Sequence, residues 1–543
     1  MSIFGYNLGN LIAVKCSKFS WPTRRFTFEP EPYSIGLPER GKHITNGFFL
    51  FEGHLVEAQN TSIWDIKCPN ADFEKELHGF GWLDHLAADG SAKARNLAKQ
   101  WFWEWIERFG GGLGPGWCPQ LTGRRIIRVI NHSQILLFNE SVKKQKIYFK
   151  ILGHQANFLS RRAKAEKSGL KRLEALTGLI FCASVLKGKE HFLKSNMKKL
   201  NRESMRCINK NGDVSSRNPE ELMHIFIMLS WAARAIIEVK RKPLKNHLLA
   251  IELIAPNLRA LRLGNGGLVH FHGGGRGMPG RLDQALSEIS NRLPARIGGA
   301  MGYHRISNNG TILIMDVGAQ IKRNEPSFSA LAFELSIGHE ELIVNTGPGM
   351  LFGNNWLDAS RTLYAHSGVC IDETTPSVGR TDVVPKAERK ESADVVELNS
   401  SHDGFALSHG VLHYRKIEMN RKGSIISGRD TILADGVSHC GIFDGWLKRK
   451  NAKFMPFNAR FHISPDVNLE FGIHDTVVSM TTPKGDVWIL RSKNAKISIQ
   501  ESAYMQYGRL NPRAAKQVVV SGSAVDYQGV IEWTLSRLEV MDH

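Results

Sequence analysis

The sequence lacks the patterns that mark several large classes of protein. It contains no run of about 18 apolar residues, which excludes a membrane-spanning helix. The HExxH, GxSxG and P-loop patterns are absent, so these signatures of metalloproteases, hydrolases and nucleotidases are excluded. The seven Cys residues include no CxxC pair, which argues against a disulfide framework or a thiolate zinc site and favours a reducing compartment.

A signal peptide is not expected either. The opening segment, MSIFGYNLGNLIAVKC, has no basic n-region, and Asn7 and Asn10 interrupt its apolar stretch. On the sequence we therefore predict a cytoplasmic protein.

The composition is globular, with a strong positive charge. Of 543 residues, 42% are hydrophobic and 23% charged, and the formal net charge is +19. This length predicts two or three domains. Residues 141–245 hold 24 Lys and Arg against 8 Asp and Glu, which is most of the excess. Such a segment attracts nucleic acid, an anionic membrane surface or an acidic polysaccharide; the alternative is a solvated helical face that keeps the protein soluble.

Up to about residue 290, apolar residues recur at helical spacing. Leu97, Trp101, Trp105 and Phe109 step by four, and a longer stripe follows the pair Asn218-Pro219, which is typical of a helix start. Further helices are predicted at 124–138, 155–165, 170–187, 190–208, 245–263 and 281–291, and Pro256 is expected to kink or split one of them.

From about residue 300, short β-branched runs between turn residues replace this pattern. Strands are predicted at 311–317, 331–336, 341–345, 424–433, 486–490, 496–499, 517–521 and 530–535. No helix of useful length is expected between them, which predicts antiparallel sheets stacked as a sandwich. The boundary with the helical domain is expected in the loop-rich stretch 264–300.

One glycine-rich segment formally matches a nucleotide-binding pattern. Residues 275–280 read GRGMPG, but no βαβ unit surrounds them and no acidic residue follows about twenty positions on. We interpret the segment as a loop between the domains.

The 21 His residues are the main chemical signal. Those that stand near Tyr, Arg or Asn are candidates for a site, and an ordinary structural hydrogen bond is the alternative role for each. They are His132, His304 beside Tyr303, His366 near Arg361, and His402 ahead of His413 and Arg415.

Eight segments between about residue 45 and the C-terminal end carry one resemblance. They read RRIIRVINHSQILL (124–137), SSRNPEELM (215–223), GYHRISNNGTILIMDVG (302–318), LAFELSIGHEELIVNTG (331–347), RTLYAHSGVCID (361–372), SHDGFALSHGVLHYRKIEM (401–419), ARFHISPDV (459–467) and QESAY (500–504). Together they resemble a bacterial branch of the heparinase II/III-like family.

The resemblance implies a fold and an activity. The expected fold is α+β and multidomain, with an N-terminal extension at 1–44, an incomplete α/α toroid at 45–290 and an antiparallel β-sandwich at 300–543. The implied activity is polysaccharide lyase chemistry on uronic-acid polymers that lie in a cleft between the two domains. That reaction requires a group that neutralises the uronate carboxylate, a base that removes the adjacent proton, and an acid that protonates the departing oxygen.

The sequence departs from the family pattern at several positions. The HADALSF-type segment reads SFSALAF at 327–333, so Ser327 stands where a His is expected. Glu221 replaces the Tyr of a Pro-x-Tyr-His segment, and the stretch 168–173 contains neither member of the toroid Asn-His pair. Asn345 stands where an Asp of a zinc site is expected.

A lyase with this sequence therefore uses a different set of residues. His366 is the one candidate metal ligand retained, so we predict no metal site and no cofactor. The predicted set has Tyr303 as acid, His304 or His366 as base, Arg361 or Arg217 with Asn218 as carboxylate neutralisers, and His132, His402 and Arg415 as further substrate-binding candidates.

Three functions follow, in order of preference. The first is a lyase that cleaves an acidic, uronate-containing glycan by β-elimination, and the second is a non-catalytic glycan-binding or cell-envelope-associated protein on the same fold. The third function, nucleic-acid binding, rests on charge alone. Because no known nucleic-acid-recognition motif is present, we expect no sequence-specific nucleic-acid binding. Lyases of this family usually act outside the cytoplasm, so the periplasm or cell envelope is the alternative location. The polysaccharide and the oligomeric state stay open.

Overall fold

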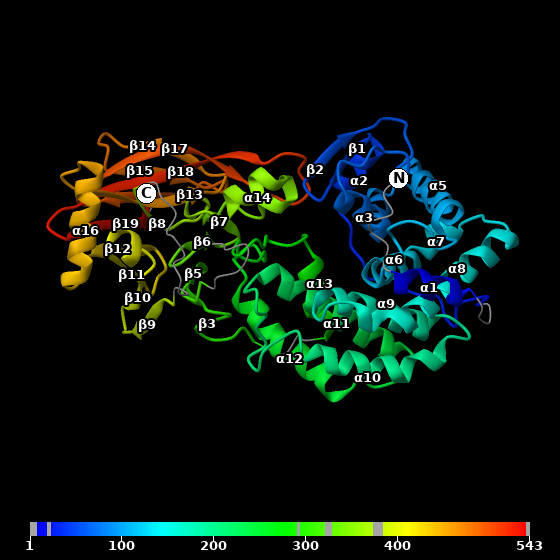
Figure 1. Cartoon of the computed structure of the whole chain (residues 1–543). Coiled ribbons are helices and arrows are strands. Elements are labelled where there is room, and N and C mark those ends of the chain that lie inside the picture. Colours follow the sequence, from blue (N-terminus) through cyan, green and yellow to red (C-terminus); the bar gives the residue numbers. More distant parts are fainter. Residues whose placement is uncertain (1–7, 19–22, 290–293, 321–327, 373–383, 539–543) are drawn as a thin grey trace, which may run out of the picture.

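The first half of the chain is helical in the computed structural model, which describes residues 8–18, 23–289, 294–320, 328–372 and 384–538 (Figure 1). The helices are α1 (Leu8–Ser17), α2 (Pro38–Thr45), α3 (Ala71–Gly79), α4 (Gly81–Asp89), α5 (Ala92–Phe109), α6 (Pro119–Asn131), α7 (Ser133–Leu137), α8 (Val142–Arg162), α9 (Leu170–Val185), α10 (Leu193–Ser204), α11 (Pro219–Glu238), α12 (Lys245–Ala260) and α13 (Arg281–Ile289), with 3-10 turns η1 (Ala163–Ala165) and η2 (Glu190–Phe192). A hairpin of β1 (Phe48–Phe51) and β2 (His54–Glu57) follows α2.

Polar caps fix where the helices begin. The Asn218 side chain accepts hydrogen bonds from two backbone N–H groups in the first turn of α11, and Pro219 occupies a position that needs no N–H donor. The helix predicted after this pair is confirmed. Ser141 caps α8 in the same way, so this helix begins at Val142, well before the predicted 155–165. Pro256 is expected from the sequence to kink or split a helix, and the split is wrong, because α12 runs through that residue without a break.

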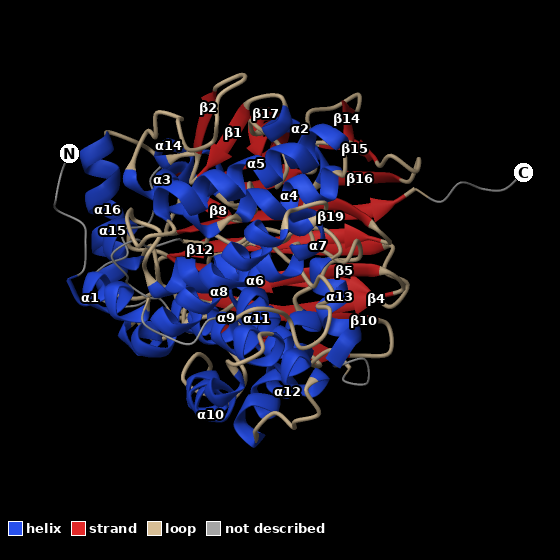
Figure 2. Ribbon diagram, turned by 90° about the vertical axis from the view of Figure 1, so that its right-hand side faces the viewer, coloured by secondary structure: helices blue, strands red, loops and turns tan. Residues whose placement is uncertain are grey.

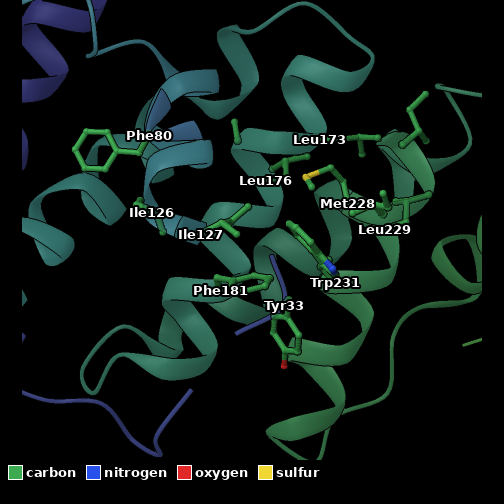
Figure 3. Close-up of a cluster of buried hydrophobic side chains, with 14 of the residues drawn as sticks. Tyr33, Phe80, Ile126, Ile127, Leu173, Leu176, Phe181, Met228, Leu229 and Trp231 are labelled. Atoms are coloured by element: carbon green, nitrogen blue, oxygen red, sulfur yellow. The ribbon is translucent and has the colours of Figure 1, made fainter. Parts of the chain in front are cut away.

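The helices share one hydrophobic core, to which the N-terminal segment contributes (Figure 3). The ring of Tyr33 lies 5.5 Å from that of Phe181 in α9 and 6.5 Å from that of Trp231 in α11. Upstream, the backbone N–H of Thr27 donates to the carbonyl of Val185 at 2.8 Å. The described part of the segment predicted as an extension is therefore packed into the helical half.

The second half forms two antiparallel sheets. Within the described residues their strand orders are β14-β15-β16-β19-β12-β11-β10-β9 and β17-β18-β13-β7-β6-β5-β4-β3, and β8 pairs with β13. The strands are β3 (Gly299–Ala300), β4 (Tyr303–Asn308), β5 (Thr311–Asp316), β6 (Phe333–Ile337), β7 (Glu340–Val344), β8 (Val369–Ile371), β9 (Lys386–Glu391), β10 (Val395–His402), β11 (Leu412–Asn420), β12 (Ile425–Leu433), β13 (Met455–Ile463), β14 (Asn468–Phe471), β15 (Val477–Thr481), β16 (Val487–Ser492), β17 (Lys496–Tyr504), β18 (Arg513–Ala524) and β19 (Gln528–Arg537). The helical elements of this half are η3 (Gly349–Phe352), α14 (Asn354–Ser360), η4 (Leu363–Ala365), α15 (Ala406–His409) and α16 (Val437–Lys450).

The two sheets pack face to face around an apolar core. The ring of Trp533 in β19 lies 5.9 Å from that of Phe333 in β6 and 5.0 Å from that of Phe461 in β13. The predicted order, a helical domain followed by an antiparallel sandwich, is confirmed. One expectation is wrong, because the 14-residue α16 lies between β12 and β13. Its only buried side chains are Phe443 and Trp446, so its apolar stripe is too narrow to stand out in the sequence.

Two of the contacts between the helical half and the sandwich lie at β4 and at the β1–β2 hairpin (Figure 1). Arg305 of β4 donates to the carbonyl oxygens of Ala260 and Arg262, at 3.2 and 2.6 Å. The β1–β2 hairpin packs against the segment before α14 so closely that a Cβ on Gly53 would lie 2.3 Å from the backbone nitrogen of Gly353. Seen from the helical side, the strands cross behind the helices (Figure 2). In the described ranges, no helix is long and apolar enough to span a membrane.

Candidate functional site

The face of the β17-to-β3 sheet that points away from the sandwich core carries a row of polar residues. Tyr303 pairs directly with Asp316, and residues that pair across an antiparallel ladder share a face. Glu334 pairs with Ile314, two residues before Asp316, so it belongs to the same face. Farther along, Tyr504 is buried beside Val344, which pairs with His462 on the next strand. These residues form a polar face against the helical half.

Asp316 is the centre of this face and is saturated with donors. The guanidinium of Arg217, just before α11, makes a short hydrogen bond to it, so the carboxylate ties the helical half to the sheet. Although burial alone raises it, Arg217 and His272 hold the pKa of the Asp316 carboxyl below its usual range. Its other donors are His272 Nε2 (3.1 Å), Gln320 Nε2 (3.0 Å), Ser329 Oγ (2.6 Å) and the backbone N–H of Gly318 (3.1 Å).

Two of the predicted site residues, Tyr303 and Arg217, contact each other. The Tyr303 hydroxyl donates to the backbone carbonyl of Arg217 at 2.7 Å, and the Tyr303 side chain is only 1% exposed. Burial raises the pKa of Tyr303 well above its ordinary value. Arg217 also donates to the carbonyl oxygens of Met301 and Ala319, at 2.9 and 3.0 Å. Both side chains therefore join the start of α11 to the sheet.

His366 lies beside this pair, on the far side of Phe271. The Phe271 ring is 5.1 Å from the Tyr303 ring and 6.3 Å from the imidazole of His366, which is nearly parallel to it. His366 Nδ1 lies 2.8 Å from the carbonyl of Thr362, and burial lowers its pKa to about 4. The ring is therefore neutral at pH 7, with its proton on Nδ1 and a lone pair on Nε2. Together with the cap residue Asn218, the structure gathers four of the predicted residues at this junction.

A second carboxylate on the polar face holds a buried histidine. Glu334 lies 3.0 Å from His270 Nδ1 and accepts the backbone N–H of Asn345 at 2.7 Å. Although burial lowers it, the Glu334 carboxylate holds the pKa of His270 above its ordinary value. His270 Nε2 is buried without a hydrogen-bond partner.

The remaining predicted residues lie elsewhere. His304 follows Tyr303 in β4 and therefore points to the opposite face of the sheet. His132 follows α6, where its Nε2 lies 2.8 Å from the Asp84 carboxylate. Arg361 follows α14 and is only 3.9 Å from the exposed Asp358. The structure does not bring these three to the junction.

His402 and Arg415 belong to a buried network inside the sandwich. Arg415 donates to both oxygens of Asp430, at 2.6 and 3.1 Å. His413 lies 2.9 Å from the same carboxylate and 3.2 Å from His402. Every member is at least nine-tenths buried, so a large ligand does not reach them in this conformation.

A more accessible group of cations lies where the two halves face each other. We name Arg40 of α2, His224 of α11, Arg281 of α13 and Tyr507 of the β17–β18 connection the inter-domain cationic cluster. In the described part of the chain neither Arg40 nor Arg281 has a carboxylate partner; Arg40 donates to the carbonyl of Leu50 at 3.0 Å, and Arg281 lies 5.4 Å from the ring of Trp231.

Electrostatics sets these four residues apart. Burial lowers the pKa of Arg281, although the Asp84 carboxylate raises it, and burial also lowers the pKa of Arg40. The His224 side chain is 33% exposed, yet burial and the Arg281 guanidinium lower its pKa to about 3. Burial and the nearby Glu220 raise the pKa of Tyr507 to about 12. The cluster therefore presents two unpaired guanidiniums beside a neutral imidazole and a protonated phenol.

Sequence reasoning missed most of these residues. Asp316 and Glu334 leave a signal, because each is the single acid in a mostly apolar strand, where burial without a partner is unfavourable. Arg40, Arg281 and Tyr507 leave none, since they lie hundreds of residues apart and only the packing of the two halves brings them together.

The residues at the expected zinc position are engaged in hydrogen bonds. Asn345 donates from Nδ2 to the carbonyl of His270 at 3.1 Å and accepts the backbone N–H of Ser367 at 2.8 Å. Ser327, at the position of the expected His, lies outside the described residues. Among the residues that are described, no three His, Cys, Asp or Glu side chains come together as a metal site. These residues do not fit a zinc ion.

Comparisons with known proteins agree on the fold. Residues 291–534 match the sequence model of the family "Heparinase II/III-like, C-terminal". The chain is 24% identical over 538 residues to "FtsZ-localized protein C" of Caulobacter vibrioides, covering 94% of this chain and 89% of that protein. The crystal structure of heparinase III superposes with a TM-score of 0.67 at 14% identity, over 97% of this chain and 89% of the other. The heparan sulfate lyase of Pedobacter heparinus superposes with a TM-score of 0.56 at 14% identity, over 98% and 88%.

Proposed function

We propose, from the premise that this chain is a heparinase II/III-like protein, that it binds an acidic, uronate-containing glycan at the inter-domain cationic cluster and cleaves it by β-elimination. The observation that carries the proposal is that Arg40 and Arg281 have no carboxylate partner within the described residues. A guanidinium that is partly buried without a counter-ion is unfavourable, and a bound carboxylate or sulfate relieves that cost.

The same cluster supplies groups suited to the elimination. We assign the neutralisation of the uronate carboxylate to Arg281, because two N–H donors of a guanidinium match two carboxylate oxygens. His224 is neutral and removes the proton next to the carboxylate, and a bound anion raises its pKa toward the ordinary range. Tyr507 keeps its proton at pH 7 and donates it to the departing glycosidic oxygen.

We propose that the buried junction positions this site. Arg217 precedes α11, and its bonds to Asp316 and to the sheet hold the first turn of the helix that carries His224. In this arrangement the Tyr303 hydroxyl is not available to donate a proton to a substrate, because it already donates to the Arg217 carbonyl. His366, with a lone pair on Nε2, is the second candidate for the base.

The test is ultraviolet absorbance of the unsaturated uronate product, with purified protein against a panel of acidic polysaccharides. A rise in absorbance that Tyr507→Phe and His224→Ala abolish, and that the opposite-face control His304→Ala retains, supports the assignment. A rise that both variants retain keeps the lyase and overturns the site. Absence of a rise with glycans that bind overturns the elimination and leaves a glycan-binding protein.

A non-catalytic role is the second candidate, and one comparison favours it. The relative that matches 94% of this chain is named for localisation with FtsZ and not for an activity on glycans. On this alternative, the chain associates with FtsZ in the cytoplasm. Co-sedimentation of the purified chain with FtsZ filaments from the same organism tests it, and failure to sediment with the filaments overturns it.

A further inference from the structure

We propose that the helical half carries a second anion-binding site, a pocket for an organic phosphate or sulfate, on the side where α9 and α11 end. The pocket has a volume of about 820 Å³ and is lined by α10, the ends of α9 and α11, and residues 27 and 28 of the N-terminal segment. We name it the outer pocket. Its volume lies within the usual range of small-molecule sites, roughly 300–1,000 Å³.

One wall of the outer pocket is apolar and fixed. Phe28, Leu193, Met197 and Val239 line it. Two hydrogen bonds hold the N-terminal segment in place, because both the backbone N–H and the hydroxyl of Thr27 donate to the carbonyl of Val185, at 2.8 and 2.9 Å. This wall suits the sugar, base or acyl body of a ligand.

Four cations also line the pocket, and all four side chains belong to exposed residues. Lys194, Lys240, Arg241 and Lys242 line it, and none of them forms an ion pair with a described carboxylate. Four such charges around one concave surface attract an anion strongly.

The two acids that line the pocket are already engaged. Glu190 accepts the backbone N–H of Gly188 at 2.8 Å. Glu238 accepts a short hydrogen bond from the Tyr33 hydroxyl and lies 3.6 Å from Arg234 Nε. The four cations outnumber these two carboxylates, so the lining of the pocket keeps an excess of positive charge.

Two local features support a built site. Lys240 adopts a left-handed conformation, with φ of 57°, which is uncommon for a residue with a side chain. It lies two residues after the end of α11 at Glu238, and Arg241 and Lys242 follow it. Ser184 is 1% exposed and lines the pocket, and its hydroxyl has no hydrogen-bond partner. A buried hydroxyl without a partner is rare, and this one belongs to a residue in the wall of the pocket.

Cations on one side and apolar side chains on the other select an anion with an apolar body. Phosphate and sulfate esters carry the charge and the acceptor oxygens that Lys and Arg bind. Nucleotides, sulfated sugars and phospholipid headgroups share this chemistry, so the experiment separates them.

Isothermal titration of the full chain with three probes tests the proposal: ATP, a sulfated heparin disaccharide and short-chain phosphatidic acid. We expect at least one probe to bind, and the double variant Arg241→Ala, Lys242→Ala to weaken it tenfold or more. The control double variant Lys143→Ala, Lys146→Ala removes the same charge from the exposed start of α8 and is expected to leave the affinity unchanged.

Three outcomes overturn the proposal. They are that no probe binds, that both double variants weaken binding equally, or that the Arg241–Lys242 variant leaves the affinity unchanged. Arg281→Ala is expected to have no effect on this binding, so the test is independent of the proposed glycan site.

Discussion

The junction around Asp316 and the inter-domain cationic cluster contain the same kinds of residue but use them differently. At the junction, Arg217 and Asp316 form a buried pair whose remaining atoms have further partners. In the cluster, Arg40 and Arg281 have no carboxylate partner in the described ranges. A complete set of partners is typical of residues that hold the fold, and we interpret the unpaired charge of the cluster as the mark of a ligand-binding site.

The sandwich interior follows the same rule. Arg415 and His413 share one carboxylate, that of Asp430, and Trp533 Nε1 donates to it at 3.2 Å. His402 and Arg415 remain predicted substrate-binding residues, but their complete set of partners favours a structural role.

The largest effect is expected from acid, which acts on the buried, paired regions. Burial lowers the pKa of His78 and His462 to about 3 and of His247 and His366 to about 4. The unfolded chain takes up protons below its ordinary His pKa of about 6.5, whereas the folded chain does not, so stability is lost as pH falls. At pH 5 each residue opposes folding by about 2 kcal/mol. Denaturant midpoints that stay constant between pH 7 and 5 contradict this.

The next largest effect is expected from Asp316→Asn. This change leaves the buried Arg217 without its counter-ion, and breaking such a pair costs about 3–5 kcal/mol. Asp65→Asn is the matched control, since it breaks an exposed pair with Arg108 that is worth at most about 1 kcal/mol. Urea denaturation measures the free energy of unfolding of each variant. A larger loss in Asp316→Asn than in Asp65→Asn is expected, because only the first change breaks a buried ion pair. Equal losses contradict the structural role of Asp316.

Arg281→Ala is expected to change binding and not stability. Removing the charge-assisted hydrogen bonds of Arg281 is expected to weaken the binding of an acidic oligosaccharide about tenfold to a hundredfold. This loss of affinity is equivalent to about 1.5–3 kcal/mol. Arg429→Ala, on the outer face of the sandwich, removes the same charge and is expected to leave the affinity unchanged. Fluorescence anisotropy with a labelled uronate oligosaccharide measures the affinity of both variants. An equal loss of affinity in the two would mean that only the net charge matters, and would contradict a specific role of Arg281.

The smallest effect is expected from Tyr303→Phe. It removes one buried hydrogen bond, to the Arg217 carbonyl, and costs about 1 kcal/mol of stability. Glycan affinity is expected to change less than in Arg281→Ala. A Tyr303→Phe variant of unchanged stability that has lost all product formation contradicts a positioning role and restores this residue as the acid.

Most of the architecture, and little of the site, was predictable from sequence. Periodicity shows the helix after Asn218-Pro219 and strands such as β5 and β12, because each buries one continuous apolar face. Tyr303, His366 and Arg217 were predicted as members of one site, and the structure places them close together, but their roles as acid, base and carboxylate neutraliser stay predictions. Arg281 and Tyr507 were not, since an unpaired charge is visible only when its surroundings are known.

A crystal structure of the chain with a bound uronate oligosaccharide would test the proposed glycan site directly. We expect a uronate carboxylate within hydrogen-bond distance of the Arg281 guanidinium, with Tyr507 beside the glycosidic oxygen and the Arg217–Asp316 pair unchanged. An oligosaccharide bound elsewhere, or one that displaces Asp316 from Arg217 to reach Tyr303, contradicts it.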